Sequence, residues 1–471
     1  MTHRRSPHDS TRVTSIAAVA AHTLALASLL GTLAACGQVR PLPPPLGCTI
    51  TAYKLLPTQH DPQRLANTAN LEALVGTGAA PASFGEAVAR RMQVRNRITR
   101  APRREVLVLS GGSQHGAFGA GFFRGMKATG GIPDYDIVTG VSTGALQSTF
   151  VFLANRAEPS DRDHFPVYQN VDRGLGTPGT SNIDDLALAY AIGSESDIFD
   201  VGSLGYLGAA LHGSIGNFRP LRSLIGAVIT PETIKAVSDE EAIGRSLFVG
   251  VTNLDDGYGY AIDMTKLAAD GVRNATVAAT RECYIEALVA SSSVPPGVPP
   301  VALKRTDAKD PDLYLDGGAR FGVFFDQLGA IVAADKPADM TLIVNGFLYG
   351  ESWADKQGKE RPARWSAVSF GLRTVSLLQN QVYRLSIADA EQWAIDRGTL
   401  KMAFISNENL GEMAMDPRDW AYPVGGPSCR AAKQSDTRQS APEEFYPRYM
   451  RCMIDYGDQR ARHDRWNKVL P

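Results

Sequence analysis

The chain has 471 residues, of which 44% are hydrophobic and 21% are charged, the ordinary composition of a globular protein. Its 48 basic and 49 acidic side chains leave a net charge of −1, without the basic surplus that a nucleic-acid partner favours. The length allows roughly two or three domains. We divide the chain into four parts, residues 1–35, 36–103, 104–332 and 333–471.

The first part has the features of a secretory signal peptide. A positively charged start with Arg4, Arg5 and Arg12 precedes an Ala- and Leu-rich run at 16–33. The run ends in Leu33-Ala34-Ala35-Cys36, which resembles a bacterial lipobox, so we expect lipid attachment at Cys36. The next residue is Gly37 rather than Asp, which favours the outer membrane of the cell envelope. The alternative is an uncleaved anchor helix, although the run is shorter than the ~20 residues that a span needs.

The second part, 36–103, combines a proline-rich spacer at 41–45 with a basic helical pattern at 82–100. Four cysteines follow the lipobox, namely Cys48, Cys283, Cys429 and Cys452. Export permits disulfides, and we expect Cys429 to pair with Cys452 while Cys283 stays a buried thiol. No cysteine spacing indicates a metal site, and we expect no cofactor.

The third part, 104–332, alternates strands and helices. The apolar run Val106–Leu109 predicts a buried strand, and a helical pattern covers Ala117–Ala128. A second strand at 136–139 and a second helix to about 154 follow. This order is typical of a parallel sheet covered by helices. Later strands are predicted at 247–251, 258–264, 342–344 and 402–405.

Three other segments carry weaker patterns. The polar segment 158–180 and the Gly-rich segment 193–216 are either covers over a site or surface insertions. In the fourth part, 333–471, a long helix presents an apolar face that we expect to be core, and an irregular tail begins at Pro427. That face comprises Trp365, Val368, Leu372, Val375, Val382 and Leu385.

The motif Gly140-Val141-Ser142-Thr143-Gly144 stands between a predicted strand and a predicted helix. A serine in this setting is typical of a nucleophile elbow, whose glycines let the chain turn tightly. The upstream turn 110–116 also leaves a strand and opens a helix, so its backbone N–H groups point outward. We therefore expect Gly111, Gly112 and Ser113 to form an oxyanion hole. A dinucleotide-binding loop is the competing interpretation, but it requires glycine where Ser113 stands.

The base that would activate Ser142 has two candidates. The order Ser142, Asp316, His463 is that of an α/β-hydrolase triad, but charged residues flank His463 and only one strand–helix unit precedes the elbow. The other candidate is a dyad with Asp316, which precedes two glycines. A carboxylate is a weak base for an alcohol, so burial must raise its pKa or the loop must stabilise the alkoxide. A plain turn remains the alternative for Asp-Gly-Gly.

Together these motifs resemble the patatin-like phospholipase family. Two further segments add to the resemblance, Phe218–Arg222 with its Pro-Leu-Arg and 289–301 with its Ala-Ser and Pro-Pro-Val sequences. The resemblance implies a three-layer α/β/α fold with a mainly parallel sheet, a Ser142–Asp316 dyad and metal-free hydrolysis of lipid acyl esters. Two residues depart from the family's loop: Ser113 replaces its third glycine, and His115 replaces its arginine.

We therefore expect a lipid acyl hydrolase, of phospholipase A or esterase type, acting on a membrane lipid or another acyl ester. One alternative is an acyltransferase that uses the same dyad and passes the acyl group to an alcohol. Another is a non-catalytic envelope lipoprotein that keeps the fold as a binding scaffold.

Overall fold

The computed structural model describes residues 47–55, 83–162, 174–201, 214–295, 297–325, 328, 332, 336–348, 367–405, 420, 425–440, 442 and 444–471. The expected signal peptide, Cys36 and Trp365 lie outside the described residues. The same holds for 163–173 and 202–213, the central stretches of the two segments that were considered as covers.

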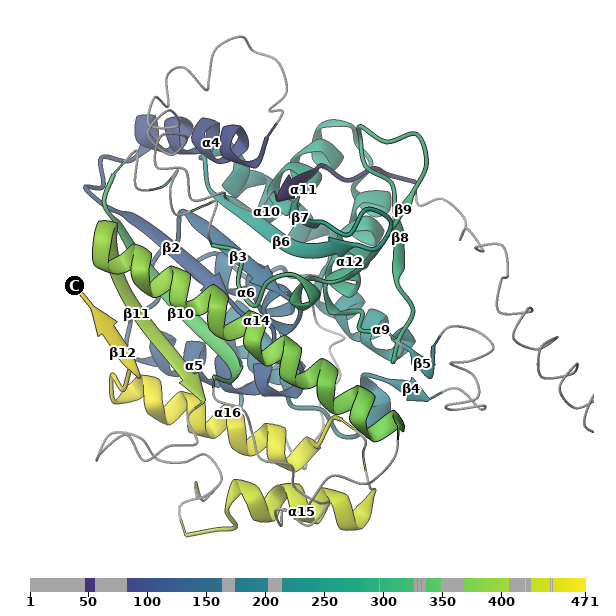
Figure 1. Cartoon of the computed structure of the whole chain (residues 1–471). Coiled ribbons are helices and arrows are strands. Elements are labelled where there is room, and N and C mark those ends of the chain that lie inside the picture. The colour runs from purple at the N-terminus through teal and green to yellow at the C-terminus, as the bar shows by residue number, and fades with distance from the viewer. Residues whose placement is uncertain are drawn as a thin grey trace, which may run out of the picture.

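A mixed sheet of ten strands forms the centre of the described fold (Figure 1). The strand order is β1-β7-β6-β3-β2-β10-β11-β12, with β9 paired to β6 and β8 paired to β9. The central strands from β6 to β11 run parallel, and the strands outside them pair antiparallel. The bounds are β1 Ala52–Leu55, β2 Arg104–Leu109, β3 Ile137–Val141, β6 Ser246–Asn253, β7 Gly259–Asp263, β8 Val301–Leu303, β9 Asp312–Asp316, β10 Ala338–Phe347, β11 Gly398–Ile405 and β12 Lys468–Leu470.

Both faces of the central strands are buried. In β2, Val106 and Val108 contribute to the hydrophobic cluster on one face, and Leu107 and Leu109 contribute to the cluster on the other. A strand that is covered on both sides needs apolar side chains in both directions, which explains its continuous apolar run. The predicted strands at 106–109, 136–139, 247–251, 342–344 and 402–405 all belong to this sheet, and 258–264 returns antiparallel beside β6.

Helices cover the sheet on both sides, which confirms the three-layer α/β/α fold with a mainly parallel centre. Helices α4 and α14 pack on one face, and α5, α6, α12 and α16 pack on the other. Figure 1 shows α14 crossing β10 and β11 on the side opposite α5 and α16. The helices are α4 Phe84–Ile98, α5 Gly116–Ala128, α6 Thr143–Phe152, α7 Asn182–Tyr190, α9 Arg219–Val228, α10 Pro231–Ala242, α11 Met264–Arg273, α12 Val277–Ser292, α14 Ala367–Arg397, α15 Cys429–Gln439 and α16 Pro447–Arg462. None of the described helices is long and apolar enough to cross a membrane.

The second half of α14 buries a different face from the one expected from the sequence, and the side chains of Val368, Leu372 and Val375 lie outside the described ones. Leu385, assigned to the core, is 57% exposed, whereas Tyr383, Ile387, Ala390 and Ala394 are buried. These four residues recur at spacings of four, three and four, so they also form a continuous helical stripe. Small side chains in this stripe let the helix approach the sheet, a feature that a search for large apolar residues overlooks.

The expected irregular tail is wrong, because the C-terminal segment forms α15, α16 and β12. Helix α16 packs closely along α5: a Cβ on Gly121 would lie 1.9 Å from the Ile454 carbonyl oxygen. Its first turn is capped by the buried Asp436 of α15, whose carboxylate accepts from the backbone N–H groups of Arg448 (2.9 Å) and Tyr449 (3.2 Å). Because this segment carries many charged residues, its composition did not indicate the one buried face of α16 that completes the core.

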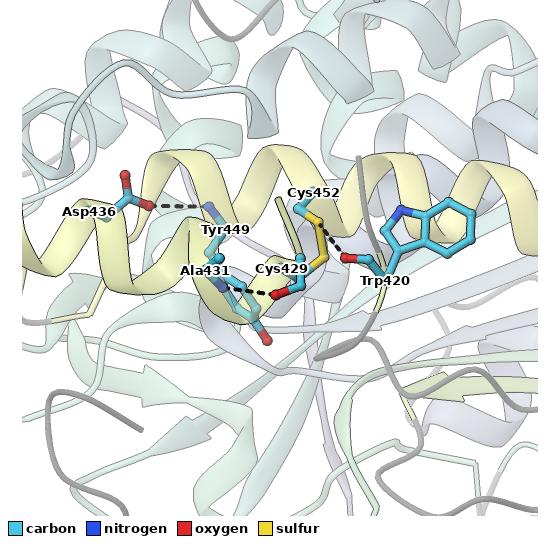
Figure 2. The surroundings of a disulfide bond; sticks show 7 residues. Trp420, Cys429, Ala431, Asp436, Tyr449 and Cys452 are labelled. Atoms are coloured by element: carbon cyan, nitrogen blue, oxygen red, sulfur yellow. Dashed lines mark hydrogen bonds between the residues drawn. A yellow bond between two sulfur atoms is a disulfide. The ribbon is translucent and has the colours of Figure 1, made fainter. Parts of the chain in front are cut away.

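A disulfide joins Cys429 at the start of α15 to Cys452 in α16, as predicted (Figure 2). The backbone N–H of Cys429 also donates to the Trp420 carbonyl oxygen over 2.7 Å. A second disulfide corrects the expectation of a buried thiol: Cys48, before β1, pairs with Cys283 of α12. Their separation of 235 residues left no local signal for this pairing.

Replacing both Cys429 and Cys452 with alanine should lower the free energy of unfolding by about 3 kcal/mol, because the bridge closes a chain segment of 23 residues in the unfolded state. Urea unfolding followed by circular dichroism measures the loss. Under reducing conditions the variant and the wild type should differ much less. An unchanged midpoint in the absence of reductant would contradict a stabilising role for the bridge.

Candidate active site

Ser142 stands at a sharp turn between β3 and α6. Its backbone has φ 54° and ψ −124°, a conformation that costs free energy for any residue with a side chain. The flanking glycines allow the turn to close. A Cβ on Gly140 would lie 2.5 Å from the Gly144 carbonyl oxygen, and a Cβ on Gly144 would lie 2.6 Å from that of Leu109. The predicted strand–turn–helix geometry of an elbow is therefore present.

Asp316 ends β9 and interacts with Ser142. Its side chain is 3% exposed, and its Oδ1 accepts the backbone N–H of Gly318 over 2.6 Å. Its Oδ2 makes no hydrogen bond of standard geometry with the described residues. Burial is the largest influence on this carboxyl and raises its pKa to about 6, while hydrogen bonding from Ser142 and Gly318 lowers it. The carboxylate is therefore a stronger base than an exposed aspartate but is still ionised at neutral pH.

The end of α12 holds both halves of this pair. The Ser291 hydroxyl accepts from the backbone N–H of Ser142 (2.9 Å) and donates to the Gly250 carbonyl oxygen in β6 (2.7 Å). The Ser293 carbonyl oxygen accepts from the backbone N–H of Asp316 (2.8 Å). The Ala-Ser stretch that contributed to the family resemblance thus positions the elbow relative to the carboxylate.

The glycine-rich loop follows β2, the strand next to β3 in the sheet. Gly112 has φ 149° and Ser113 has φ 51°, so Ser113 adopts a left-handed conformation where glycine would be unstrained. Within the described part of the chain, no residue accepts a hydrogen bond from the N–H groups of Gly111, Gly112 or Ser113. The loop therefore retains free donors beside the elbow, as an anion site requires.

Asn345 at the end of β10 supports this loop, and its role had not been recognised from the sequence. Its backbone N–H donates to the Ser110 hydroxyl (2.8 Å), and its Nδ2 donates to the Ser110 carbonyl oxygen (3.0 Å) and to Gln147 Oε1 (2.8 Å). Gln147 Nε2 donates to the Gly116 carbonyl oxygen (2.7 Å). The available signal was an amide residue that directly follows an apolar run, Leu342-Ile343-Val344-Asn345.

His115, which replaces the family's arginine, is an uncharged support for the loop. Burial, followed by the charge of Lys433, lowers the pKa of His115 to about 3. Its Nδ1 lies 3.2 Å from the Gly112 carbonyl oxygen and, as the protonated nitrogen of a neutral ring, donates to it. His115 therefore supplies no positive charge to the site.

His463, the alternative base, lies at the end of the sheet that is remote from Ser142. It follows the last turn of α16, where Ala461 packs against Gly125 near the carboxyl end of α5. Helix α5 begins at the anion loop, so its other end is distant from Ser142. The structure thus brings Ser142, Asp316 and the Gly111–Ser113 loop together and leaves His463 apart. Among the described residues, no group of three or more His, Cys, Asp or Glu side chains is arranged to hold a metal ion.

The fold and site define an α/β protein with a buried serine–carboxylate pair at the carboxyl edge of a parallel sheet. Residues 107–328 match the family model described as patatin-like phospholipase, and the match covers the strands that carry Ser142 and Asp316. The match to this family supports a lipid acyl hydrolase activity in general. Of the solved structures, VipD from Legionella pneumophila is similar at 12% sequence identity and a TM-score of 0.27, over 79% of this chain and 68% of that one. No curated protein matches the sequence.

Proposed function

We propose that this protein hydrolyses acyl esters of lipids with a Ser142–Asp316 dyad. Ser142 Oγ attacks the ester carbonyl carbon while Asp316 accepts its proton. The N–H groups of Gly111, Gly112 and Ser113 stabilise the oxyanion, and the alcohol leaves with the proton from Asp316. Water then hydrolyses the acyl-enzyme and releases the fatty acid.

The observation that carries the proposal is the buried carboxylate beside the strained serine. Asp316 Oδ2 makes no hydrogen bond of standard geometry with the described residues, and burial raises the pKa of this carboxyl group. Free N–H groups lie on the adjacent loop. A scaffold that only binds ligands has no need for a strained serine in contact with a buried base.

The test is labelling with a fluorophosphonate, followed by product analysis with phospholipid vesicles. A hydrolase is labelled at Ser142 and releases free fatty acid. With added alcohol acceptors, an acyltransferase forms a new ester in place of the fatty acid. A folded protein that neither reacts with the probe nor releases fatty acid would be a scaffold.

The rate should depend on pH through Asp316. Only the carboxylate accepts a proton, and its pKa is raised to about 6. The value of kcat/KM for a chromogenic ester should therefore rise about tenfold per pH unit below pH 6 and level off above it. The measurement is a pH–rate profile at an ester concentration below KM. A flat profile down to pH 4 would exclude Asp316 as the base.

We further propose that the protein is exported and anchored through lipid on Cys36. Both cysteine pairs of the described residues form disulfides, which suits an oxidising compartment. This pairing uses four of the five cysteines in the sequence and leaves Cys36 for attachment. Mass spectrometry of the membrane fraction should show an acylated Cys36, and Cys36→Ser should release the protein from that fraction. A wild-type protein without acyl groups would refute the anchor.

A further inference from the structure

A tyrosine from outside the matched domain enters the site. The hydroxyl oxygen of Tyr383, on α14, is 1.9 Å from the point where a Cβ on Gly111 would stand, and Ser142 Cβ is 3.1 Å from the same point. The same oxygen is 3.5 Å from the Cβ position of Gly318, where Asp316 Oδ1 lies at 2.9 Å. The phenol therefore lies among the anion loop, the elbow and the carboxylate.

Close packing of α14 on the segment after Asp316 fixes this position. A Cβ on Gly322 would lie only 2.5 Å from Tyr383 Cα, so glycine permits the helix to approach. The Gly322 N–H donates to Ser386 Oγ (3.1 Å), whose hydroxyl donates to the Val382 carbonyl oxygen (2.9 Å). The backbone on both sides of Tyr383 is thus held against the site.

The Tyr383 hydroxyl has no hydrogen-bond partner among the described residues. The residue is 8% exposed, and its oxygen makes no hydrogen bond with any residue in the described ranges. A hydroxyl group without such a bond keeps its donor available for a bound substrate. Burial and the nearby Asp316 charge raise the pKa of Tyr383, so the phenol keeps its proton and remains a donor.

We propose that Tyr383 is a catalytic residue whose hydroxyl donates a hydrogen bond to the oxygen of the substrate's acyl carbonyl. This inference rests on the proposed acyl-ester hydrolysis. When Ser142 Oγ bonds to the carbonyl carbon, its proton passes to Asp316 and the carbonyl π electrons move onto oxygen. Tyr383 stabilises that negative charge together with the loop N–H groups and keeps its own proton. Collapse restores the carbonyl and expels the alcohol, which takes the proton from Asp316.

The test is Tyr383→Phe, which keeps the ring and removes only the hydroxyl. We expect kcat to fall about 10²- to 10³-fold, with KM changed less than about threefold, because the donor acts on developing charge. The affinity for a trifluoromethyl ketone, which forms a tetrahedral adduct with serine, should fall by the same factor as kcat/KM. The melting temperature should stay equal or rise, since the lost hydroxyl makes no hydrogen bond with the described part of the chain.

The matched control is Tyr135→Phe. Tyr135 is also buried, but it precedes the amino end of β3, whereas Ser142 follows the carboxyl end. This control should leave kcat unchanged. If Tyr383→Phe keeps kcat within about twofold, or raises it, while Ser142→Ala is inactive, the role of Tyr383 is wrong and the proposed function stands. If the wild type and Ser142→Ala hydrolyse esters equally, both proposals fail.

Discussion

Replacing Ser142 with alanine is expected to reduce ester hydrolysis at least about 10⁴-fold, because no other group in the site forms the acyl-enzyme. The change preserves the backbone N–H bond to Ser291, so the elbow should remain folded. Hydrolysis of a chromogenic ester and fatty-acid release from phospholipid both measure the loss. Fluorophosphonate labelling should disappear in parallel. A folded variant that keeps near-normal activity would remove the serine from the mechanism.

The partner variant, Asp316→Asn, should lower kcat about 10³-fold, since an amide cannot accept the proton of Ser142. It should not destabilise the protein. The pKa of Asp316 is raised from 3.8 to about 6 on folding, so the native state binds this proton more tightly than the unfolded state. The carboxyl therefore lowers stability as the pH rises from about 4 to about 6, and the cost is complete above that window.

The melting temperature of Asp316→Asn should accordingly equal or exceed that of the wild type at pH 8, and this difference should shrink at pH 4. The exposed Asp307 provides the matched control: Asp307→Asn should change neither activity nor melting temperature. Loss of stability without loss of activity in Asp316→Asn would indicate a structural aspartate and overturn the dyad.

Gly112→Ala should impair both catalysis and stability. A Cβ at this position would lie 1.1 Å from the Asn345 carbonyl oxygen, and φ is 149°, so the loop must move. We expect a fall in kcat of about 10²- to 10³-fold through lost oxyanion donors, and a loss of about 3 kcal/mol or more in the free energy of unfolding. Ester kinetics and urea unfolding measure these two quantities.

Two further variants make the Gly112 result decisive. Gly131→Ala adds a methyl group whose nearest neighbours are 3.6 Å away, and it should change neither quantity. If Gly112→Ala does not fold, Asn345→Ala provides a milder test, since it removes the side-chain bonds to Ser110 and Gln147 without a clash. It should lower kcat more than it raises KM. Full activity of a folded Gly112→Ala would show that the loop does not act on the oxyanion. Full activity of Asn345→Ala would show that its side chain is not needed to hold the loop.

The site residues that the sequence predicted are those that belong to a motif of neighbouring residues. Ser142 was accessible because an elbow needs glycines within two residues, and the Gly111–Ser113 loop was accessible because it joins a strand to a helix. Asp316 was selected through its following glycines and the family resemblance. The roles of Ser291, Asn345 and Tyr383 were not predicted, because each acts on a residue distant in the chain.

The C-terminal part shows the same difference between what the local sequence pattern predicts and what tertiary packing decides. The tail after Pro427 has many charges, so its buried face was not recognised until α16 was seen against α5. Leu385 fitted a helical stripe by spacing, but packing of Gly322 against Tyr383 turned another face of α14 inward. Helical periodicity predicts that a helix has a buried side, whereas the partner determines which side is buried.

By itself the sequence determined the alternating strands and helices, the strained serine turn and the glycine-rich loop, because apolar periodicity and tight turns depend on neighbouring residues. Only the tertiary structure decided what surrounds Ser142: the buried carboxylate of Asp316, the Asn345 support and the Tyr383 hydroxyl from α14. These contacts join segments that are far apart in the sequence. Burial also set the pKa of Asp316 and the charge of His115, and burial is a property of the packed molecule rather than of the local chain.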